Sequence, residues 1–181
     1  IDLAHFLVGR IETVSCLTAN FISERPLPGA GAATFSAGSD AASTARGKVT
    51  VEDASLMHVQ FANGAIGSFE ATRFASGRKN RNRFEIYGSE GSLAFDLERM
   101  NELEFYSRND PEHARGFRTI LVTEACHPYA GRWWPPGHTI GYEHTFVHAV
   151  ADFVTALHTG GPIHPDFGDG LRVIAVLEAG L

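Results

Sequence analysis

The middle of the chain is organised in runs where apolar and polar residues alternate. Asn63-Gly64 separates two such runs, residues 54–62 and 65–75. An Asn-Gly pair between alternating runs predicts a hairpin with a type I′ turn, in which both turn residues have positive φ. Beyond it, the alternating apolar positions are Phe84, Ile86, Leu93, Phe95, Leu97, Leu103 and Phe105. The pattern predicts an antiparallel sheet with one apolar face, and that face needs a cover.

Two segments with helical periodicity are candidates to cover the apolar face of this sheet. We expect one helix over residues 143–158, with an apolar stripe formed by Phe146, Val150, Phe153, Val154 and Leu157. A second helix is expected over residues 169–181, with Asp169 as its N-cap. The predicted fold class is therefore α+β: six or seven mainly antiparallel strands in a single large open sheet, with both helices packed on one face.

The length and the local composition bound the domain organisation. With 181 residues the chain can form one domain with its own core, and we interpret residues 1–181 as a single domain truncated at both ends. Residues 23–48 are rich in Ala, Gly, Ser and Pro, which predicts a long mobile surface loop. Within it, the Gly29-x-Gly31 pair lacks the third glycine of a phosphate-binding loop, so we expect no cofactor binding by this chain.

Charge and cysteine content exclude several classes of function. A net charge of −6 argues against binding to nucleic acid or to an anionic membrane. No apolar run is long enough to span a bilayer. The two cysteines, Cys16 and Cys126, are far apart in the sequence, which favours a reducing, cytoplasmic location.

The segment from Arg132 to His138 carries the most suggestive chemistry. Its sequence, RWWPPGH, combines aromatic rings, prolines that stiffen the backbone, and a histidine. Aromatic faces stack on the apolar faces of sugar rings, and an imidazole can donate or accept a hydrogen bond, so Trp134 and His138 are candidate substrate-binding residues. An aromatic plug over the edge of the sheet explains the same residues equally well.

Two polar clusters favour ordinary structural roles. His144, His148 and Asp152 are spaced four apart on one helix face, which could bind zinc, but we expect a solvated or interface-facing row and no metal site. The cations of residues 78–83 could hold a phosphate, yet a solvated hairpin end is the simpler reading.

Three blocks of the sequence together resemble one enzyme family. IDLAHFLVG opens the chain, NGAIGSFEATRFASGRKNRNRFEIYGSEGSLAFD lies in its middle, and GYEHTFVHAVADFVTAL with PDFGDGLRVIAVLEA closes it. They resemble the C-terminal domain of the glucose–fructose oxidoreductase / inositol dehydrogenase / MocA family. The resemblance covers nearly the whole chain except residues 23–48.

The resemblance implies a division of labour between two domains. Family members use NAD or NADP, held by an N-terminal Rossmann domain that this chain does not contain. The family's catalytic lysine lies in that domain, and its catalytic histidine belongs to an Asp-x-x-x-His-x-x-Asp motif whose final residue matches Asp2. We therefore expect no catalytic residue in this chain, Asp2 as a positioning group behind the histidine, and no turnover by the chain alone.

Two function classes remain open from the sequence. The first is the substrate-binding and oligomerising half of an NAD(P)-dependent dehydrogenase acting on a sugar or cyclic polyol. The second is a non-catalytic sheet module for assembly or ligand binding. In both, we expect a homodimer or larger assembly through the open sheet face, where Tyr87 and Tyr106 lie among charged residues in the predicted register.

Overall fold

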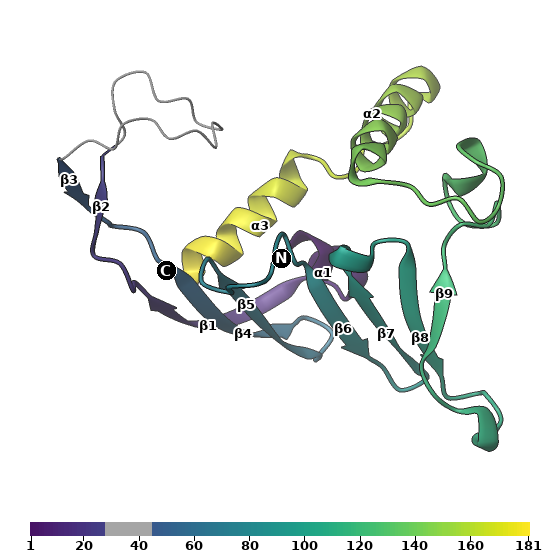
Figure 1. Cartoon of the computed structure of the whole chain (residues 1–181), viewed down its shortest axis with the longest axis horizontal. Helices are drawn as coiled ribbons and strands as arrows, with labels where there is room; N and C mark the ends of the chain where they lie inside the picture. The colour runs from purple at the N-terminus through teal and green to yellow at the C-terminus, as the bar shows by residue number, and fades with distance from the viewer. Residues whose placement is uncertain (28–44) are drawn as a thin grey trace. The chain divides into compact units, whose positions relative to one another are not determined.

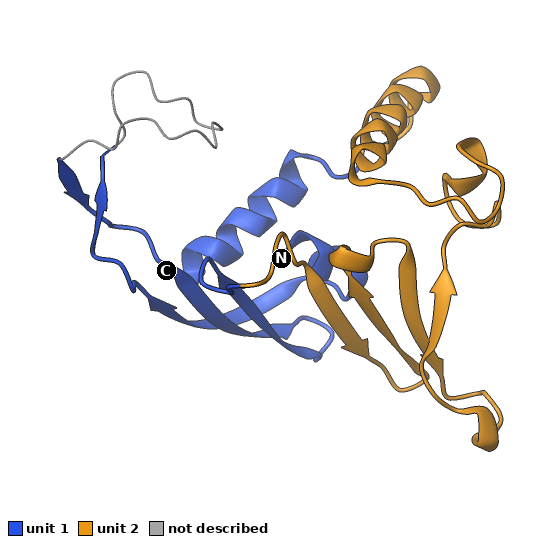
Figure 2. Ribbon diagram, viewed as in Figure 1, with its two compact units in different colours: residues 1–76, 164–181 blue, residues 77–163 orange. Residues whose placement is uncertain are grey.

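The computed structural model describes residues 1–27 and 45–181, and divides the chain into two compact units (Figure 1, Figure 2). Unit 1 comprises residues 1–76 and 164–181, and unit 2 comprises residues 77–163. The α+β class and the antiparallel pairing are confirmed. The predicted mobile loop falls largely on residues 28–44, which lie outside the described residues, and its two ends form short paired strands.

The elements of unit 1 are α1 (Asp2–Leu7), β1 (Ile11–Ala19), β2 (Glu24–Pro26), β3 (Arg46–Lys48), β4 (Ala54–Phe61), β5 (Ile66–Thr72) and α3 (Phe167–Ala179). Those of unit 2 are β6 (Arg83–Tyr87), β7 (Gly91–Asp96), η1 (Leu97–Arg99), β8 (Glu102–Ser107), η2 (Glu112–Ala114), β9 (Arg118–Leu121), η3 (Ala130–Arg132) and α2 (Tyr142–Thr159). Both predicted helices exist, although α3 begins two residues earlier than expected. Its N-cap is Asp166, whose carboxylate accepts from the backbone N–H of Asp169.

Unit 1 is built on a three-stranded antiparallel sheet in the order β1-β4-β5. Alternate residues of β4 point to one face and are buried there, as the period of two predicts. Helix α3 contributes Val176 to the same core. The buried cluster consists of Ile11, Met57, Val59, Phe61 and Val176. Burial of this apolar surface is what holds the sheet and α3 together.

The β4–β5 hairpin forms where Asn63-Gly64 predicts it, but with a different turn. Gly64 has φ +88°, whereas Asn63 does not have positive φ, so the type I′ expectation is wrong. The N–H of Gly64 donates to the carbonyl of Phe61, and a glycine in the left-handed region follows the turn, the arrangement of a three-residue loop with a bulge. The Asn63 side chain is used elsewhere: its amide donates to the carbonyl of Val8, at the end of α1.

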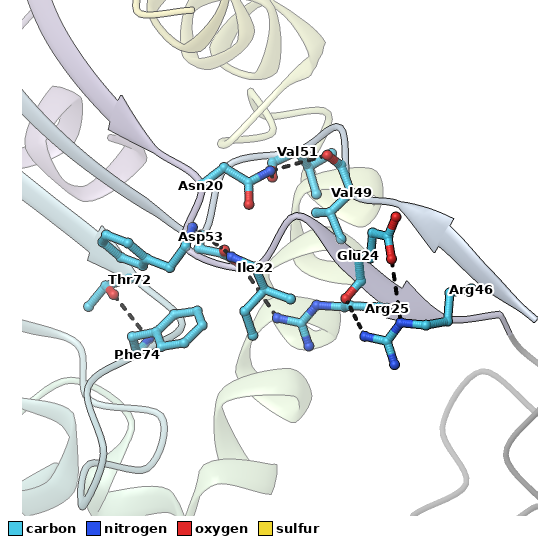
Figure 3. Close-up of polar contacts among 11 residues, drawn as sticks. Asn20, Ile22, Glu24, Arg25, Arg46, Val49, Val51, Asp53, Thr72 and Phe74 are labelled. Atoms are coloured by element: carbon cyan, nitrogen blue, oxygen red, sulfur yellow. Dashed lines mark hydrogen bonds and ion pairs between the residues drawn. The ribbon is translucent and has the colours of Figure 1, made fainter. Parts of the chain in front are cut away.

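Strands β2 and β3 form an arm that leaves the sheet of unit 1, and the buried carboxylate of Asp53 fixes its base (Figure 3). Asp53 is only 6% exposed and accepts from the backbone N–H groups of Phe21 (2.8 Å) and Ile22 (3.0 Å). It also pairs with Arg25 of β2 at 3.4 Å. The Asn20 amide donates to the carbonyls of Val49 and Val51, which follow β3. Because a two-stranded ribbon is marginal alone, the arm depends on these anchors.

Unit 2 is built on a four-stranded antiparallel sheet in the order β6-β7-β8-β9. The register places Phe84, Phe95, Leu103 and Ile120 side by side across the four strands. The predicted apolar face is therefore real, and its side chains are half-buried. On the opposite face, Tyr87 and Tyr106 both lie beside Ser92, as the predicted register requires.

The strands are hydrogen-bonded in three separate sheets among the described residues, rather than in the single sheet expected from the sequence. The two helices likewise belong to different units, α3 to unit 1 and α2 to unit 2. Residues 73–82 connect β5 to β6 through turns and bends, with Gly77 at φ +92°. They form no tight hairpin, and β5 and β6 are not paired.

None of the helices in the described part of the chain is sufficiently long and apolar to cross a bilayer.

Asp53→Asn tests the anchor of the arm. Hydrogen bonds from the backbone N–H groups of Ile22 and Phe21, with the nearby Arg25, hold the pKa of Asp53 below its ordinary value. The charged form therefore stabilises the fold above the ordinary pKa of an aspartate, and this contribution is lost as the pH falls through the lowered pKa. Thermal unfolding at neutral pH should show a lower Tm for Asp53→Asn than for the unmodified chain, and the gap should narrow on acidification.

Glu24→Gln is the matched control, because it removes an exposed ion pair with Arg46 (3.6 Å) on the same arm. It should change the Tm little at any pH. A gap between Asp53→Asn and the unmodified chain that stays constant down to strongly acidic pH would contradict the assigned role.

Candidate functional site

The residues singled out in the sequence, Arg132 to His138, belong to the connection between β9 and α2 in unit 2. We call this connection, residues 122–141, the aromatic segment. The C-terminal end of this segment is held by Asn101, which lies in the turn leading into β8. The Asn101 amide donates to the carbonyl of Ile140 (2.9 Å), and its side-chain oxygen accepts from the N–H of Ile140 (3.0 Å). Both bonds are partly buried, so this contact fixes the place where the segment enters α2.

On the N-terminal side of the exposed turn, the segment is held by Tyr129. Its hydroxyl donates to the Asp152 carboxylate at 2.6 Å, and its ring stacks on His148 with centroids 4.3 Å apart. The Asp152 carboxylate, as acceptor and as nearby charge, raises the pKa of Tyr129. Tyr129 also has φ +65°, a left-handed conformation that costs a residue with a side chain about 1–2 kcal/mol. The two side-chain contacts offset that strain.

Trp133 provides the central fastening and is half-buried. Its indole N–H donates to Nε2 of His148 at 2.6 Å, and its ring meets the His144 ring edge-on at 4.4 Å. Because an indole nitrogen only donates, Nε2 of His148 must be unprotonated, and the neutral ring carries its proton on Nδ1. His144 accepts the N–H of Gly141 on Nδ1, at the start of α2.

We define the polar row of α2 as His144, His148 and Asp152. The two histidines are half-buried against the aromatic segment, and Asp152 is exposed but accepts from the Tyr129 hydroxyl. The lone pairs that a zinc ion would take from the two histidines already accept hydrogen bonds, which disfavours a metal site here. The apolar stripe of α2 is exposed, contrary to the expectation that it covers the sheet. On its other side, α2 accepts hydrogen bonds from the aromatic segment: His148 accepts from the half-buried Trp133 N–H, and Asp152 accepts from the Tyr129 hydroxyl.

Between these fastenings, residues 134–139 form a turn that is exposed to solvent, which we call the Trp134–His138 turn. Gly137 has φ +89°, the conformation that the third position of a type II turn requires after a proline. Trp134 is 49% exposed. Nδ1 of His138 lies 2.9 Å from the carbonyl of Pro135, so this nitrogen is the donor. In a neutral His138 ring, Nε2 is therefore the acceptor.

This geometry suits the recognition of a polyhydroxylated ring. An exposed indole face offers a stacking surface for the C–H face of a sugar, and Nε2 of His138 can accept from a hydroxyl. The two prolines and the hydrogen bond to Pro135 limit the conformational freedom that binding would remove.

Asp2, the third predicted site residue, is the exposed first residue of α1 in unit 1. It borders an apolar groove along the first turns of α3, lined by Pro165, Asp166, Phe167, Gly170, Leu171, Val173 and Ile174. Trp134 and His138 therefore lie together on one segment, and Asp2 belongs to a different unit. Sequence reasoning missed Tyr129, because no local signal marks a tyrosine with positive φ.

The remaining charged clusters are internally paired. Arg78 pairs with Glu98 (3.0 Å), Arg81 pairs with Asp96 (3.3 Å), and Arg83 pairs with Glu85. These contacts favour the solvated hairpin end over a phosphate site. His164, Asp166 and Asp169 also lie close together, but the two carboxylates cap the first turn of α3 and Arg172 pairs with Asp169.

Comparison with known proteins identifies relatives along almost the whole chain. A levoglucosan dehydrogenase from Pseudarthrobacter phenanthrenivorans is 41% identical over 99% of this chain and 46% of that protein. The crystal structure of an oxidoreductase domain protein from Kribbella flavida is 47% identical, with a TM-score of 0.85, over 99% of this chain and 45% of that chain. A levoglucosan dehydrogenase in complex with NADH and levoglucosan is 39% identical, with a TM-score of 0.86, over 99% of this chain and 44% of that chain.

The chain therefore spans about half the length of the relatives that it matches. The model of the GFO/IDH/MocA C-terminal domain matches residues 1–94, which include α1 and the whole sheet of unit 1. The match agrees with the resemblance found in the sequence and with the α+β architecture. This chain belongs to the GFO/IDH/MocA family, as a C-terminal domain of that family's type.

Proposed function

We propose that this chain is the sugar-binding half of an NAD(P)-dependent dehydrogenase that acts on a sugar or a cyclic polyol. The observation that carries the proposal is the Trp134–His138 turn, a stiff exposed loop with a stacking face and a hydroxyl acceptor. The relatives support the same class, since they include a levoglucosan dehydrogenase with NADH and levoglucosan bound. In this assignment, Trp134 stacks on the ring and His138 accepts from a ring hydroxyl.

The cofactor belongs to the proposal as NAD or NADP bound by another part of a longer protein. The nicotinamide supplies hydride chemistry at a sugar carbon. By family resemblance, a lysine and a histidine outside this chain handle the hydroxyl proton, and Asp2 acts as a positioning group behind that histidine. This chain's part is to bind the sugar, so that the sugar is held where the nicotinamide can react with it.

The proposal also includes self-association and a cytoplasmic location. On the face of unit 2 that carries Tyr87, the ring of Tyr87 is 70% exposed and its hydroxyl donates to Glu85. Exposed aromatic rings among paired charges are typical of the surface buried when two copies meet around a two-fold axis. Cys16 and Cys126 are free thiols, which suits a reducing compartment.

Kinetics of the full-length protein test the substrate assignment. Trp134→Ala removes the stacking face and His138→Ala removes the acceptor, so each should lower kcat/KM for the preferred sugar at least ~10-fold, or ~1.4 kcal/mol. Trp134→Phe keeps an aromatic face and should recover much of the loss. Unchanged kinetics in both alanine variants would refute the sugar-binding role and favour the alternative of a non-catalytic sheet module.

Light scattering tests the assembly. The 19.6 kDa chain should give at least the mass of a dimer at tens of micromolar concentration. Tyr87→Asp places a further charge on the proposed contact and should shift the mass toward that of the monomer. A mass near 19.6 kDa for the unmodified chain would show that this face does not associate.

A further inference from the structure

The polar row of α2 makes contacts that the proposed sugar-binding role does not use. Each of the three residues contacts the aromatic segment. His144 contacts Gly141 and Trp133, and His148 contacts Trp133 and Tyr129. Asp152 contacts Tyr129. Residues four apart lie above one another on a helix, so α2 presents three partners in a line to a segment that runs along it. The row therefore fastens the segment at successive turns of one rigid helix.

His148 is the centre of this arrangement, because two aromatic side chains meet on it. The Tyr129 ring stacks on the imidazole face with an interplanar angle of 16°, while the Trp133 N–H donates to its edge at 2.6 Å. Each contact restricts a different motion: the stack fixes the plane of Tyr129, and the hydrogen bond fixes the in-plane position of Trp133. Together they determine where the backbone between residues 129 and 133 runs.

The bond between Tyr129 and Asp152 completes the restraint. The Tyr129 hydroxyl donates to a carboxylate, a charge-assisted bond of 2.6 Å that is stronger than a neutral one. The backbone of Tyr129 is in the left-handed region, where a residue with a side chain rarely remains unless its surroundings require it. A backbone outlier held by side-chain contacts, a few residues before an exposed binding turn, suggests that the restraint serves that turn.

We propose that Tyr129, His148 and Asp152 are positioning residues. Together they hold the Trp134–His138 turn in the position and orientation in which it binds the sugar. The proposal rests on the proposed function, because it gives these residues a role in substrate binding. Trp134 follows Trp133 directly in the sequence. The contact between Trp133 and His148 therefore fixes the backbone position from which the Trp134 side chain extends. Asn101 fixes the other end of the turn at Ile140. Only the turn itself remains exposed between the two fastenings.

The mechanism predicts a loss of substrate affinity without a loss of chemistry. None of the three positioning residues touches the sugar in this arrangement, and none handles a proton in the reaction. Loosening them lets the turn sample orientations that do not bind, which raises KM and leaves kcat nearly constant. A merely structural role for the same residues would lower the amount of folded protein and leave the KM of the folded fraction unchanged.

The test compares five variants of the full-length protein, one of which is a control. Tyr129→Phe removes only the hydroxyl, Asp152→Ala removes the acceptor, and the double variant removes both. Asp152→Asn keeps an oxygen that accepts from Tyr129 and serves as the rescue. Tyr142→Phe is the matched control, because Tyr142 lies on the same helix but is exposed and stacks edge-on with Phe146. For each variant, kcat and KM are measured, together with amide hydrogen exchange over residues 133–141.

Tyr129→Phe and Asp152→Ala should each raise KM about 5-fold, in keeping with the loss of one partly exposed hydrogen bond. The double variant should be no worse than the poorer single variant, because both changes break the same bond. Asp152→Asn should recover most of the affinity, and Tyr142→Phe should match the unmodified protein. Exchange over residues 133–141 should accelerate in step with KM.

Unchanged exchange in Tyr129→Phe and Asp152→Ala, or effects on KM that add in the double variant, would overturn the proposal. Faster exchange with unchanged KM would also overturn it, since the restraint would then not serve binding. Failure of the proposed function is separate and appears as unchanged kinetics in Trp134→Ala and His138→Ala. In that event, the exchange data alone still decide whether the three residues restrain the turn.

Discussion

The hydrogen bond between the Trp133 indole and His148 is the interaction on which the candidate site depends. Trp133 lies where the aromatic segment bends toward the exposed turn, and His148 lies in the middle of the polar row of α2. The bond requires a neutral imidazole with an unprotonated Nε2, and the stacked Tyr129 ring keeps that imidazole in place. Loss of the bond would leave the segment attached at Tyr129, Ile140 and Gly141, and would leave Trp133 with its ring contact to His144 but no hydrogen bond from its indole.

The same interaction accounts for which side of α2 contacts the aromatic segment. The half-buried N–H of Trp133 needs a partner, and the polar row of α2 supplies acceptors for it, for the exposed Tyr129 hydroxyl and for the Gly141 N–H. Satisfying Tyr129 and Trp133 turns the apolar stripe of α2 outward, where its residues are exposed. The exposed apolar surface has a free-energy cost. In this chain the polar contacts of the segment decide the orientation of the helix, and hydrophobic periodicity alone does not.

Much of the fold could be predicted from the sequence because its signals are local. Alternation between Phe84 and Phe105 gave the strands and the correct faces, and the apolar periodicities of α2 and α3 gave both helices. The errors arise where a longer-range contact decides. Asn63 does not take positive φ, and its side chain bonds to Val8, far away in the sequence. Alternation does not say which strands pair with one another, and β5 and β6, which were expected in one sheet, are not paired.

The candidate site was only partly visible in the sequence. Composition singled out Trp134 and His138, and the structure places both on one exposed turn, where their role in sugar binding stays a prediction. The spacing of His144, His148 and Asp152 was also visible, but it could not reveal that the row meets Tyr129 and Trp133. That pairing depends on the path of the chain between β9 and α2. It also depends on the left-handed backbone conformation of Tyr129, which no sequence motif predicts.

A crystal structure of the full-length protein with reduced cofactor and its preferred sugar would show directly whether Trp134 and His138 contact the substrate. The account predicts that the Trp134 ring lies in van der Waals contact with a C–H face of the sugar, at about 4 Å. It also predicts that Nε2 of His138 lies within about 3 Å of a sugar hydroxyl. A sugar bound in the site with the Trp134–His138 turn directed into solvent, and neither side chain in contact with it, would contradict the account.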